Sequence, residues 1–482
     1  MAQVRTRIAP APTGYLHIGT ARTALFNYLF AKKNGGTFVV RIEDTDVERS
    51  DPKYETEILG SLEWLGIHAD ESPVNGGPYG PYRQSERTAS YTKYLQKLLA
   101  QGNAFYCFHS ESELGSEREE LAEARRAPLH QCVHRGLSLR EAEEKLKAGE
   151  RAIIRFKTPA ARTLTFTDLI RGEIQFESNL LGDFSLAKDL TTPLYNFAVV
   201  IDDFEMQISH VIRGEDHIPN TPKQILIQEA LGLLRSQHAH LPLILGSDRA
   251  KLSKRHGATA IREFREAGYL PEALVNFMAL LGWNPGGEQE IFSMADFIAA
   301  FDLANIQKGG AIFNIEKLDW LNGGYIRRIS PAALGRALVP YLRGQKFIGE
   351  TYDAALVTKM AELEQPRLKK LSEIGERADY FFRDPEYDRE LIRWKEMTDA
   401  EIAASLERSR KIVTDIPESD FSVEKLQELF LKEIGKGDKG ILLWPLRVVL
   451  TGKKASPGPF EIMAILGKEK VLKRIEAAKI RF

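Results

Sequence analysis

The sequence predicts an α/β core that is interrupted by an inserted α+β unit and followed by an all-α region. Strand-type and helix-type patterns alternate over residues 1–83 and again from residue 190. Beyond a basic loop at 251–257, apolar residues recur almost entirely at helical spacing. A chain of 482 residues also exceeds the size at which one hydrophobic core usually divides, so several domains are expected.

The first half of the core, residues 1–83, is predicted to hold two strands and two helices. The strands are expected over residues 4–9 and 37–42, which are rich in β-branched and apolar residues. The helices are expected over residues 21–31, a mostly apolar run without glycine or proline, and over residues 55–65, where apolar residues form one stripe. Ligand sites in such α/β sheets lie at the carboxyl ends of the strands.

The loop between the first strand and helix, Pro10–Thr20, is the first candidate site. A strand, a glycine-bearing loop and a helix N-terminus suit phosphate, because Gly14 and Gly19 let the backbone approach closely and the helix end offers free N–H groups. His17 stands where a phosphate would lie. A Pro/Gly turn with a surface histidine is the structural alternative.

An inserted unit is expected over residues 84–189. It begins with an amphipathic helix that carries Tyr91 and Leu98, and it continues with strand patterns at 152–156 and 163–166. The core is expected to resume over residues 190–234.

In this second half of the core, residues 195–201 and 206–212 are predicted strands. The pair 202–203 is predicted to form the turn between them, and residues 222–234 a helix.

Two Cys-x-His pairs in the inserted unit are candidate metal ligands. Residues two apart on an extended segment project to the same side, so Cys107 with His109, and Cys132 with His134, can each hold one metal ion. Four protein ligands leave no open position for a substrate, so the hypothesis is a structural zinc. A buried cysteine beside a solvated histidine is the alternative.

A basic loop, Lys251-Leu-Ser-Lys-Arg-His-Gly257, lies in the next predicted domain, residues 235–330. Taken alone it fits a solvated surface loop. Two helical domains are predicted to follow, over 331–388 and 389–482. In the domain of the basic loop, helices are expected over 271–281 and 294–300. In the two helical domains they are expected over 331–342, 354–364, 367–382 and 424–434.

Composition limits the functional classes without choosing one. The formal net charge is −1, so a nucleic-acid partner would have to meet a local basic face. No apolar run of membrane-spanning length and no N-terminal signal segment is visible, so no membrane association is expected. Two cysteines build no disulfide framework, which favours a reducing, cytoplasmic location.

Several motifs together resemble a known family. Two motifs resemble the paired signatures of class I aminoacyl-tRNA synthetases. The first is His17-Ile-Gly19, which follows Pro12-Thr-Gly14, and the second is Lys251-Leu-Ser-Lys254. Further segments are similar to the bacterial glutamyl-tRNA synthetase family, so that the resemblance covers nearly the whole chain: Arg7-Ile-Ala-Pro10, Arg41-Ile-Glu-Asp-Thr-Asp46, Gly80-Pro-Tyr-Arg-Gln-Ser-Glu86, Val211-Ile-Arg-Gly-Glu-Asp-His217, Tyr269-Leu-Pro-Glu-Ala-Leu274 and Trp444-Pro-Leu-Arg447.

The resemblance implies a glutamate–tRNA ligase with a Rossmann-type catalytic core. It would activate L-glutamate with ATP, accompanied by Mg²⁺, and would transfer it to tRNA-Glu, with activation dependent on tRNA. The insertion would bind the acceptor stem, residues 235–330 would contact the tRNA stem, and the all-α region would bind the anticodon. A monomer is expected. Some members of the family carry zinc at the place of the Cys-x-His pairs, with mostly cysteine ligands where this chain has His109.

The resemblance also implies roles for single residues. His17, Lys251 and Lys254 would act on the phosphate oxygens in catalysis. The ATP site would consist of Gly14, His17, Gly19, Lys251, Ser253 and Lys254, and the glutamate site of Arg7, Ala9, Glu43, Tyr195 and Arg213. Arginine suits the substrate carboxylates because its planar fork binds them bidentately. The chain departs from the family at Thr20, often histidine, and at Val199, where a substrate-contacting asparagine is found in some members.

In the helical region, Arg367 matches the place where discriminating members put an arginine against the third anticodon base. Guanidinium offers donors only, which suit the acceptors of cytosine in tRNA-Glu and not the donors of guanine in tRNA-Gln. The alternative is that Arg367 lies on a solvated basic helix with Lys369 and Lys370 and touches phosphate without specificity. An enzyme that also charges tRNA-Gln is the alternative function.

Three competing hypotheses are a glutaminyl synthetase, a tRNA-modifying relative and a non-catalytic tRNA-binding protein. The helical tail disfavours a glutaminyl synthetase, and the length of the chain disfavours the tRNA-modifying relative. The intact signature residues disfavour a non-catalytic protein.

Overall fold

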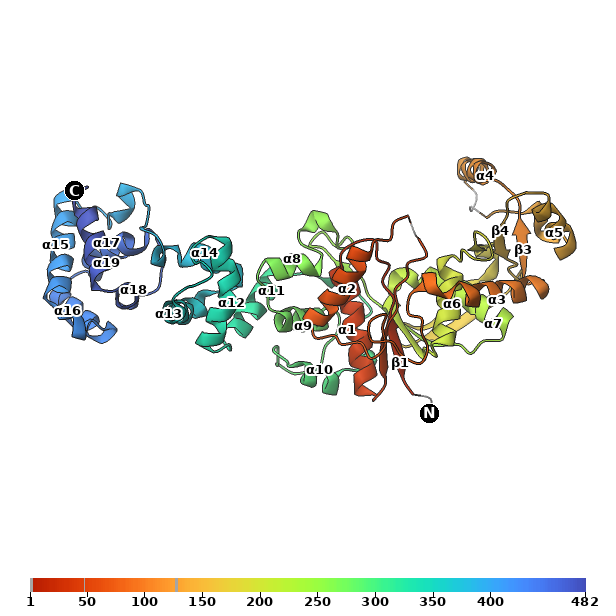
Figure 1. The fold of residues 1–482 in the computed structure, drawn as a ribbon, viewed down its shortest axis with the longest axis horizontal. Helices are drawn as coiled ribbons and strands as arrows, with labels where there is room; N and C mark the ends of the chain where they lie inside the picture. Colours follow the sequence, from red (N-terminus) through yellow and green to blue (C-terminus); the bar gives the residue numbers. More distant parts are fainter. Residues whose placement is uncertain (1–2, 47, 126–128) are drawn as a thin grey trace. The chain divides into compact units, whose positions relative to one another are not determined.

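A computed structural model describes residues 3–46, 48–125 and 129–482 (Figure 1). The chain divides into two compact units, one formed by Met1–Arg265 and Pro271–Ile315, the other by Glu266–Leu270 and Glu316–Phe482. The finer division into six domains stays a prediction. Among the described residues, no helix combines the length and the apolar character needed to cross a membrane.

The first unit contains the predicted strand–helix–strand–helix start. Strand β1 (Arg5–Ile8) pairs in parallel with β2 (Thr37–Val40), and helix α1 (Ile18–Lys33) packs on both strands. Helix α2 (Pro52–Trp64) begins with Asp51 as its N-cap. All of β1 is buried, as expected for a strand covered on both faces. These elements match their predicted positions to within a few residues.

The core sheet continues in the order β6-β5-β9-β8. Strands β8 (His210–Gly214) and β9 (Gln237–Leu241) are parallel, and β8 lies beside β1, joined by a hydrogen bond from the Ser209 N–H to the Arg5 carbonyl. Strands β5 (Thr163–Asp168) and β6 (Gly172–Glu177) come from the predicted insertion. Because β5 pairs with β9, the insertion contributes directly to the core sheet.

The rest of the insertion forms a small antiparallel sheet with three helices (Figure 1). The first helix packs on the first of these strands, and the tyrosines Tyr91 and Tyr94 are buried there. The elements are α3 (Thr88–Ala100), β3 (Ala104–Cys107), α4 (Glu111–Glu123), α5 (Leu139–Lys147), β4 (Ile153–Phe156) and β7 (Ser185–Ala187).

The strand and turn predicted over 195–203 are wrong. This segment lies within helix α6 (Tyr195–Glu205), which packs against α3 and α7 (Thr221–Leu231). The run Phe197–Asp203 is buried throughout, so tertiary packing outweighs the β-propensity of its valines and isoleucine. The strand predicted over 206–212 starts later, because the Met206 N–H still completes the helix by bonding to the Asp202 carbonyl.

Smaller elements complete the first unit. The short strands β10 (Ile244–Leu245) and β11 (Ala311–Ile312) are parallel. A 3₁₀-helix (Lys254–His256) follows in the basic loop, and then come helices α8 (Ile261–Glu266), α9 (Pro271–Leu280) and α10 (Met294–Ala300).

In the second unit, residues 316–482 are all described and form helices with no strand, as predicted. Their apolar faces meet in one core that includes Leu334, Met360, Leu406 and Val449. The α-helices are α11 (Ile315–Ile326), α12 (Pro331–Gly344), α13 (Ala354–Glu364), α14 (Ile374–Arg377), α15 (Asp399–Asp415), α16 (Val423–Ile434), α17 (Lys439–Thr451), α18 (Pro459–Leu466) and α19 (Lys468–Lys479).

One helix prediction in this unit is wrong. Residues 367–382 form short 3₁₀ turns around α14 in place of one continuous helix. Leu368 and Lys370 are extended, and the Leu371 N–H donates to the Gly268 carbonyl at 3.0 Å. A backbone donor that a helix would use internally is therefore used in a contact with a distant segment.

Candidate active site and metal cluster

A cavity of about 390 Å³ opens at the carboxyl ends of β1, β2, β8 and β9. Most of the residues predicted for glutamate and ATP line it, although they come from segments more than 200 positions apart. These are Arg7, Ala9, His17, Gly19, Glu43, Tyr195, Arg213 and Lys251. Gly14, Ser253 and Lys254 lie in the two flanking loops and are not part of the lining.

His17 is the N-cap of α1. Its Nδ1 accepts a hydrogen bond from the Gly19 N–H at 3.0 Å, which places the proton of the neutral ring on Nε2. Burial, assisted by the charge of Lys251, lowers the pKa of His17. A neutral imidazole therefore presents one N–H donor from the start of a helix, which is the position where an anion binds most favourably.

Lys251 lies at the cavity and donates to Asp216 at 2.8 Å. Lys254 begins the short 3₁₀-helix and is exposed. The loop between them is fastened at two points, since the Leu252 N–H donates to the Ile244 carbonyl and the Ser253 N–H donates to His256 Nδ1 at 3.1 Å. Two cations therefore stand on an anchored loop near the helix start of His17.

Arg7 and Glu43 are held by a buried ionic network. Asp203 accepts from Arg7 Nε at 3.1 Å and from Arg41 at 2.7 Å, while Arg41 also donates to Glu43 at 3.1 Å. Burial raises the pKa of Glu43, although Arg41 and Arg7 oppose that shift. Fixed in this way, an arginine fork and a carboxylate face the same small cavity.

Arg213 differs from Arg7 in having neutral hydrogen-bond partners. It donates to Tyr195 at 3.4 Å, to Thr221 at 2.8 Å and to His240 at 3.3 Å. The Tyr195 hydroxyl lies 3.0 Å from His217 Nδ1. Burial, together with the charge of Arg213, lowers the pKa of His217 to about 4, so the ring is neutral and accepts from Tyr195.

Sequence reasoning missed four residues of this site: Arg41, Asp203, Asp216 and His217. Arg41, Asp216 and His217 stand inside the family motifs but carry no predicted role, and Asp203 falls in the predicted turn. Asp216 and His217 line the cavity themselves. Arg41 and Asp203 act through neighbours that only the fold brings close, which no periodicity signals.

The metal ligands predicted in the inserted unit come together, with one difference. Cys107, His109, His130 and Cys132 place one ligand atom each within 4.8 Å of one another. Separations of 3.4 Å (Cys107 to His109), 3.7 Å (Cys107 to His130) and 3.6 Å (Cys132 to His109) match the spacing of about 3.3–3.8 Å that a tetrahedral zinc imposes. The donor set therefore fits zinc.

His130 joins the cluster where the sequence pointed to His134. His134 stays beside it, with Nδ1 3.6 Å from Cys132 Sγ, but that nitrogen also accepts from the Phe108 N–H at 3.3 Å. Glu117 pairs with Nδ1 of His130, which leaves Nε2 turned to Cys107. His130 is also two residues from Cys132, but in the order His-x-Cys, so a search for Cys-x-His pairs did not select it.

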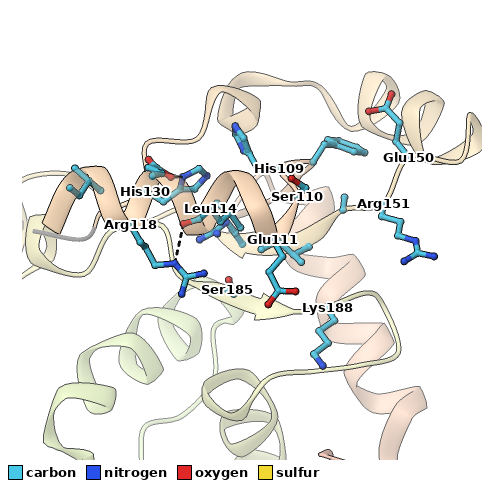
Figure 2. Close-up of a pocket in the computed structure, with 16 residues that line it drawn as sticks. His109, Ser110, Glu111, Leu114, Arg118, His130, Glu150, Arg151, Ser185 and Lys188 are labelled. Carbon is cyan, nitrogen blue, oxygen red and sulfur yellow. Dashed lines mark hydrogen bonds and ion pairs between the residues drawn. The ribbon is translucent and has the colours of Figure 1, made fainter. Parts of the chain in front are cut away.

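A cavity of about 1040 Å³ lies against this cluster (Figure 2). His109 and His130 are part of its wall, and Arg118, Arg151 and Lys188 line it from three different segments. The cluster is therefore placed to stiffen the loops that shape a partly basic hollow.

Arg367, predicted to read the anticodon, lies in a 3₁₀ turn (Gln365–Arg367) of the second unit. Its side chain is 30% exposed and stands 3.5 Å from the buried carboxylate of Glu364. That carboxylate also accepts from Tyr380 at 3.0 Å. The guanidinium is therefore anchored on one side and accessible on the other.

A parallel sheet with a histidine-capped helix on one side of its ligand cavity and a lysine-bearing loop on the other is the arrangement of class I aminoacyl-tRNA synthetases. Residues 3–320 match the family described as tRNA synthetases class I (E and Q), catalytic domain, and residues 333–479 match an anticodon binding domain.

Relatives narrow the class. The chain is 46% identical to the glutamate–tRNA ligase of Carboxydothermus hydrogenoformans, covering 98% of this chain and 99% of the relative, and 44% identical to that of Desulforamulus reducens, with coverage of 98% and 99%. A solved glutamate–tRNA ligase from Elizabethkingia meningosepticum, in complex with its amino acid, superposes with a TM-score of 0.89 at 36% identity, covering 99% of each chain. The chain belongs to the glutamate–tRNA ligase family.

Proposed function

We propose that this protein joins L-glutamate to tRNA-Glu in two steps, and that it forms glutamyl-adenylate only when tRNA is bound. Membership of the family makes it an aminoacyl-tRNA ligase that uses ATP. The observation that carries the proposal is one cavity in which the His17 donor lies with Arg7, Arg213 and Glu43.

The charges of the cavity favour glutamate over glutamine. Arg7 is already neutralised by Asp203, whereas the partners of Arg213 are neutral. Burial lowers the pKa of Arg213, which reflects the cost of a cation without a counter-charge. The side-chain carboxylate of glutamate supplies that counter-charge and the amide of glutamine does not, while Glu43 accepts from the α-ammonium group.

In the first step, the α-carboxylate attacks the α-phosphorus of ATP, the bond to the β-phosphate bridge oxygen breaks, and pyrophosphate leaves. Negative charge grows on the phosphoryl oxygens, where His17 Nε2–H and the two loop lysines donate. Lys251 exchanges its contact with Asp216 for a phosphate oxygen in this step. Mg²⁺ bound to ATP would neutralise part of the phosphate charge.

In the second step, a hydroxyl of the terminal tRNA ribose attacks the carbonyl carbon and AMP leaves. A neighbouring cavity of about 460 Å³ shares Glu43 and Tyr195 with the first and carries the cations Arg49 and Lys188. We place the 3′ end of tRNA there, since the shared residues bring it next to the adenylate. Dependence on tRNA follows if the acceptor end completes the ATP site by induced fit.

We further propose one structural zinc per chain, bound by Cys107, His109, Cys132 and His130. Elemental analysis of untagged protein should give about one zinc per chain. His130→Ala should lower that ratio more than His134→Ala. The reverse order would return the fourth position to His134, and a ratio near zero in the wild type would contradict a bound metal.

The helical unit is proposed to contact the anticodon, with Arg367 selecting tRNA-Glu over tRNA-Gln, in a cytoplasmic monomer. Charging assays test the function as a whole. Labelled glutamate should attach to a tRNA-Glu transcript, and labelled glutamine should not. Attachment of glutamine at a comparable rate, or of neither amino acid, would contradict the proposal.

A further inference from the structure

Arg213 donates hydrogen bonds to two side chains that do not line the cavity. Its Nε donates to His240 Nε2 at 3.3 Å, and its NH2 nitrogen donates to Thr221 Oγ1 at 2.8 Å. Thr221 in turn lies 3.1 Å from His240 Nε2. The remaining NH1 nitrogen is directed to Tyr195, on the cavity side. One edge of the guanidinium is thus fixed and the other faces the substrate.

His240 can serve as this acceptor only if its proton is on the other nitrogen. Asp168 Oδ2 lies 2.6 Å from His240 Nδ1, and both side chains are fully buried. The Asp168 carboxylate also accepts from the backbone N–H groups of Ile170, Arg171 and His240. It is therefore a pure acceptor facing Nδ1, so Nδ1 carries the proton and Nε2 presents its lone pair.

The contact crosses a boundary in the chain. Asp168 ends β5, which belongs to the inserted region, and His240 lies on the core strand β9 that pairs with β5. The Asp168 carboxylate also holds the turn after β5 through the two N–H groups of Ile170 and Arg171. Asp168 of the insertion thereby contacts His240, and His240 in turn contacts Arg213 at the cavity.

We propose that Asp168 and His240 form a positioning pair that sets the orientation of Arg213 toward the substrate carboxylate, with Thr221 as the second support. The inference rests on the proposed role of Arg213 as the glutamate-binding cation. Neither Asp168 nor His240 touches substrate. Together they hold His240 Nε2 as a hydrogen-bond acceptor for the Nε–H of Arg213.

The test is steady-state ATP–pyrophosphate exchange by the full chain in the presence of tRNA, with the KM for glutamate, the KM for ATP and kcat measured separately. His240→Leu, which removes the acceptor, should raise the KM for glutamate about tenfold or more, the usual consequence of losing a hydrogen bond to a charged group. The KM for ATP should stay within about twofold. His240→Gln supplies a side-chain oxygen for the Arg213 N–H and should recover most of the loss.

Asp168→Asn tests the placement of the proton. The amide can donate to Nδ1, which moves the ring proton to Nε2 and sets a donor against the donors of Arg213. The KM for glutamate should rise as it does in His240→Leu. An Asp168→Asn enzyme with the wild-type KM would overturn the proton placement and with it the pair.

Two further variants separate positioning from folding. Thr221→Val removes the second support at nearly constant volume and should also raise the KM for glutamate, whereas Thr221→Ser keeps the hydroxyl and should not. His238→Gln is the matched control, since His238 is buried on the same strand two residues away and its ring stacks on that of His240, but its own hydrogen bond goes to the Ser236 carbonyl. Its KM for glutamate should be that of the wild type.

The outcomes distinguish this inference from the proposed function. If Arg213→Lys leaves the KM for glutamate unchanged, the proposed glutamate site is wrong. If Arg213→Lys raises it while His240→Leu and Thr221→Val do not, the positioning pair alone is overturned. Equal losses in His240→Leu, His240→Gln and His238→Gln, with parallel changes in both KM values, would show a purely structural role.

Discussion

Asp203 and Arg7 form a buried ion pair, with Asp203 Oδ1 3.1 Å from Arg7 Nε. The pair lies between helix α6 and strand β1, so it ties the substrate-facing arginine to the helix behind it. Arg41 shares the same carboxylate at 2.7 Å. Arg41 has further carboxylate partners in Glu43 and Asp202, at 3.1 and 3.6 Å, so Arg7 is the guanidinium that relies on Asp203 for its counter-charge.

Asp203→Ala should lower the free energy of unfolding of the first unit by ~3–5 kcal/mol, because it leaves the buried guanidinium of Arg7 without its carboxylate partner. Urea unfolding followed by tryptophan fluorescence and circular dichroism measures the change. Glu144→Ala is the matched control. Its exposed pair with Arg140 should contribute below ~1 kcal/mol. Equal effects of the two substitutions would contradict the importance given to the Asp203 network.

Lys254→Ala should lower kcat by at least ~10²-fold with little change in the KM for ATP, because this cation acts on charge that develops in the transition state. Arg255→Ala removes the next cation of the loop, which pairs with Asp248 and is exposed. Its kcat should stay within about twofold of the wild type. A near-normal rate for Lys254→Ala would transfer the role to Lys251 or His17.

His238 makes the stability of the first unit depend on pH. Burial, and after it the charge of Arg213, lowers the pKa of His238 to about 3 from 6.5. Below pH 6.5, His238 therefore binds a proton in the unfolded chain but stays neutral in the folded state. The free energy of unfolding falls as the pH falls from about 6.5 towards 3.

His238→Gln should remove ~2 kcal/mol of the loss between pH 6.5 and 5, as the shift of one group implies. Urea unfolding of the wild type and the variant at both pH values gives the difference. If the two proteins lose the same stability between these pH values, His238 is not the group that responds.

Arg367→Gln should narrow the preference for C over G at the third anticodon base by ~1–3 kcal/mol, the usual value of one good base-reading pair. Charging of tRNA-Glu and tRNA-Gln transcripts measures it. Lys369→Gln, which removes an exposed neighbouring cation, should weaken both reactions equally. Arg367 would have no base-reading role if its own substitution reduced the two in parallel, or if the wild type charged both tRNAs equally.

The sequence predicted those parts of the fold in which local pattern and tertiary environment agree. Helix α13 was found at its observed bounds, and α1, α2 and the first two strands to within a few residues. It failed at α6, whose run Ala198-Val-Val-Ile201 has strand propensity but is buried between helices. It failed again after Arg367, where a contact to Gly268 replaces a helical hydrogen bond.

The candidate site followed the same rule. Eight predicted residues line one cavity because family motifs mark residues that touch ligands. Asp203 and His240 were not found, since they act through arginines that lie far away in the sequence. His130 joined the metal cluster from the reversed spacing His-x-Cys, which the search for Cys-x-His pairs did not cover.

The proposed function requires that one cavity activates glutamate and that tRNA is bound when it does so. ATP–pyrophosphate exchange measured with glutamate, with and without tRNA-Glu, tests this requirement most directly. We expect exchange with glutamate and tRNA together, and a background rate when tRNA is omitted or glutamine replaces glutamate. Robust exchange without tRNA, or exchange driven by glutamine, would contradict it.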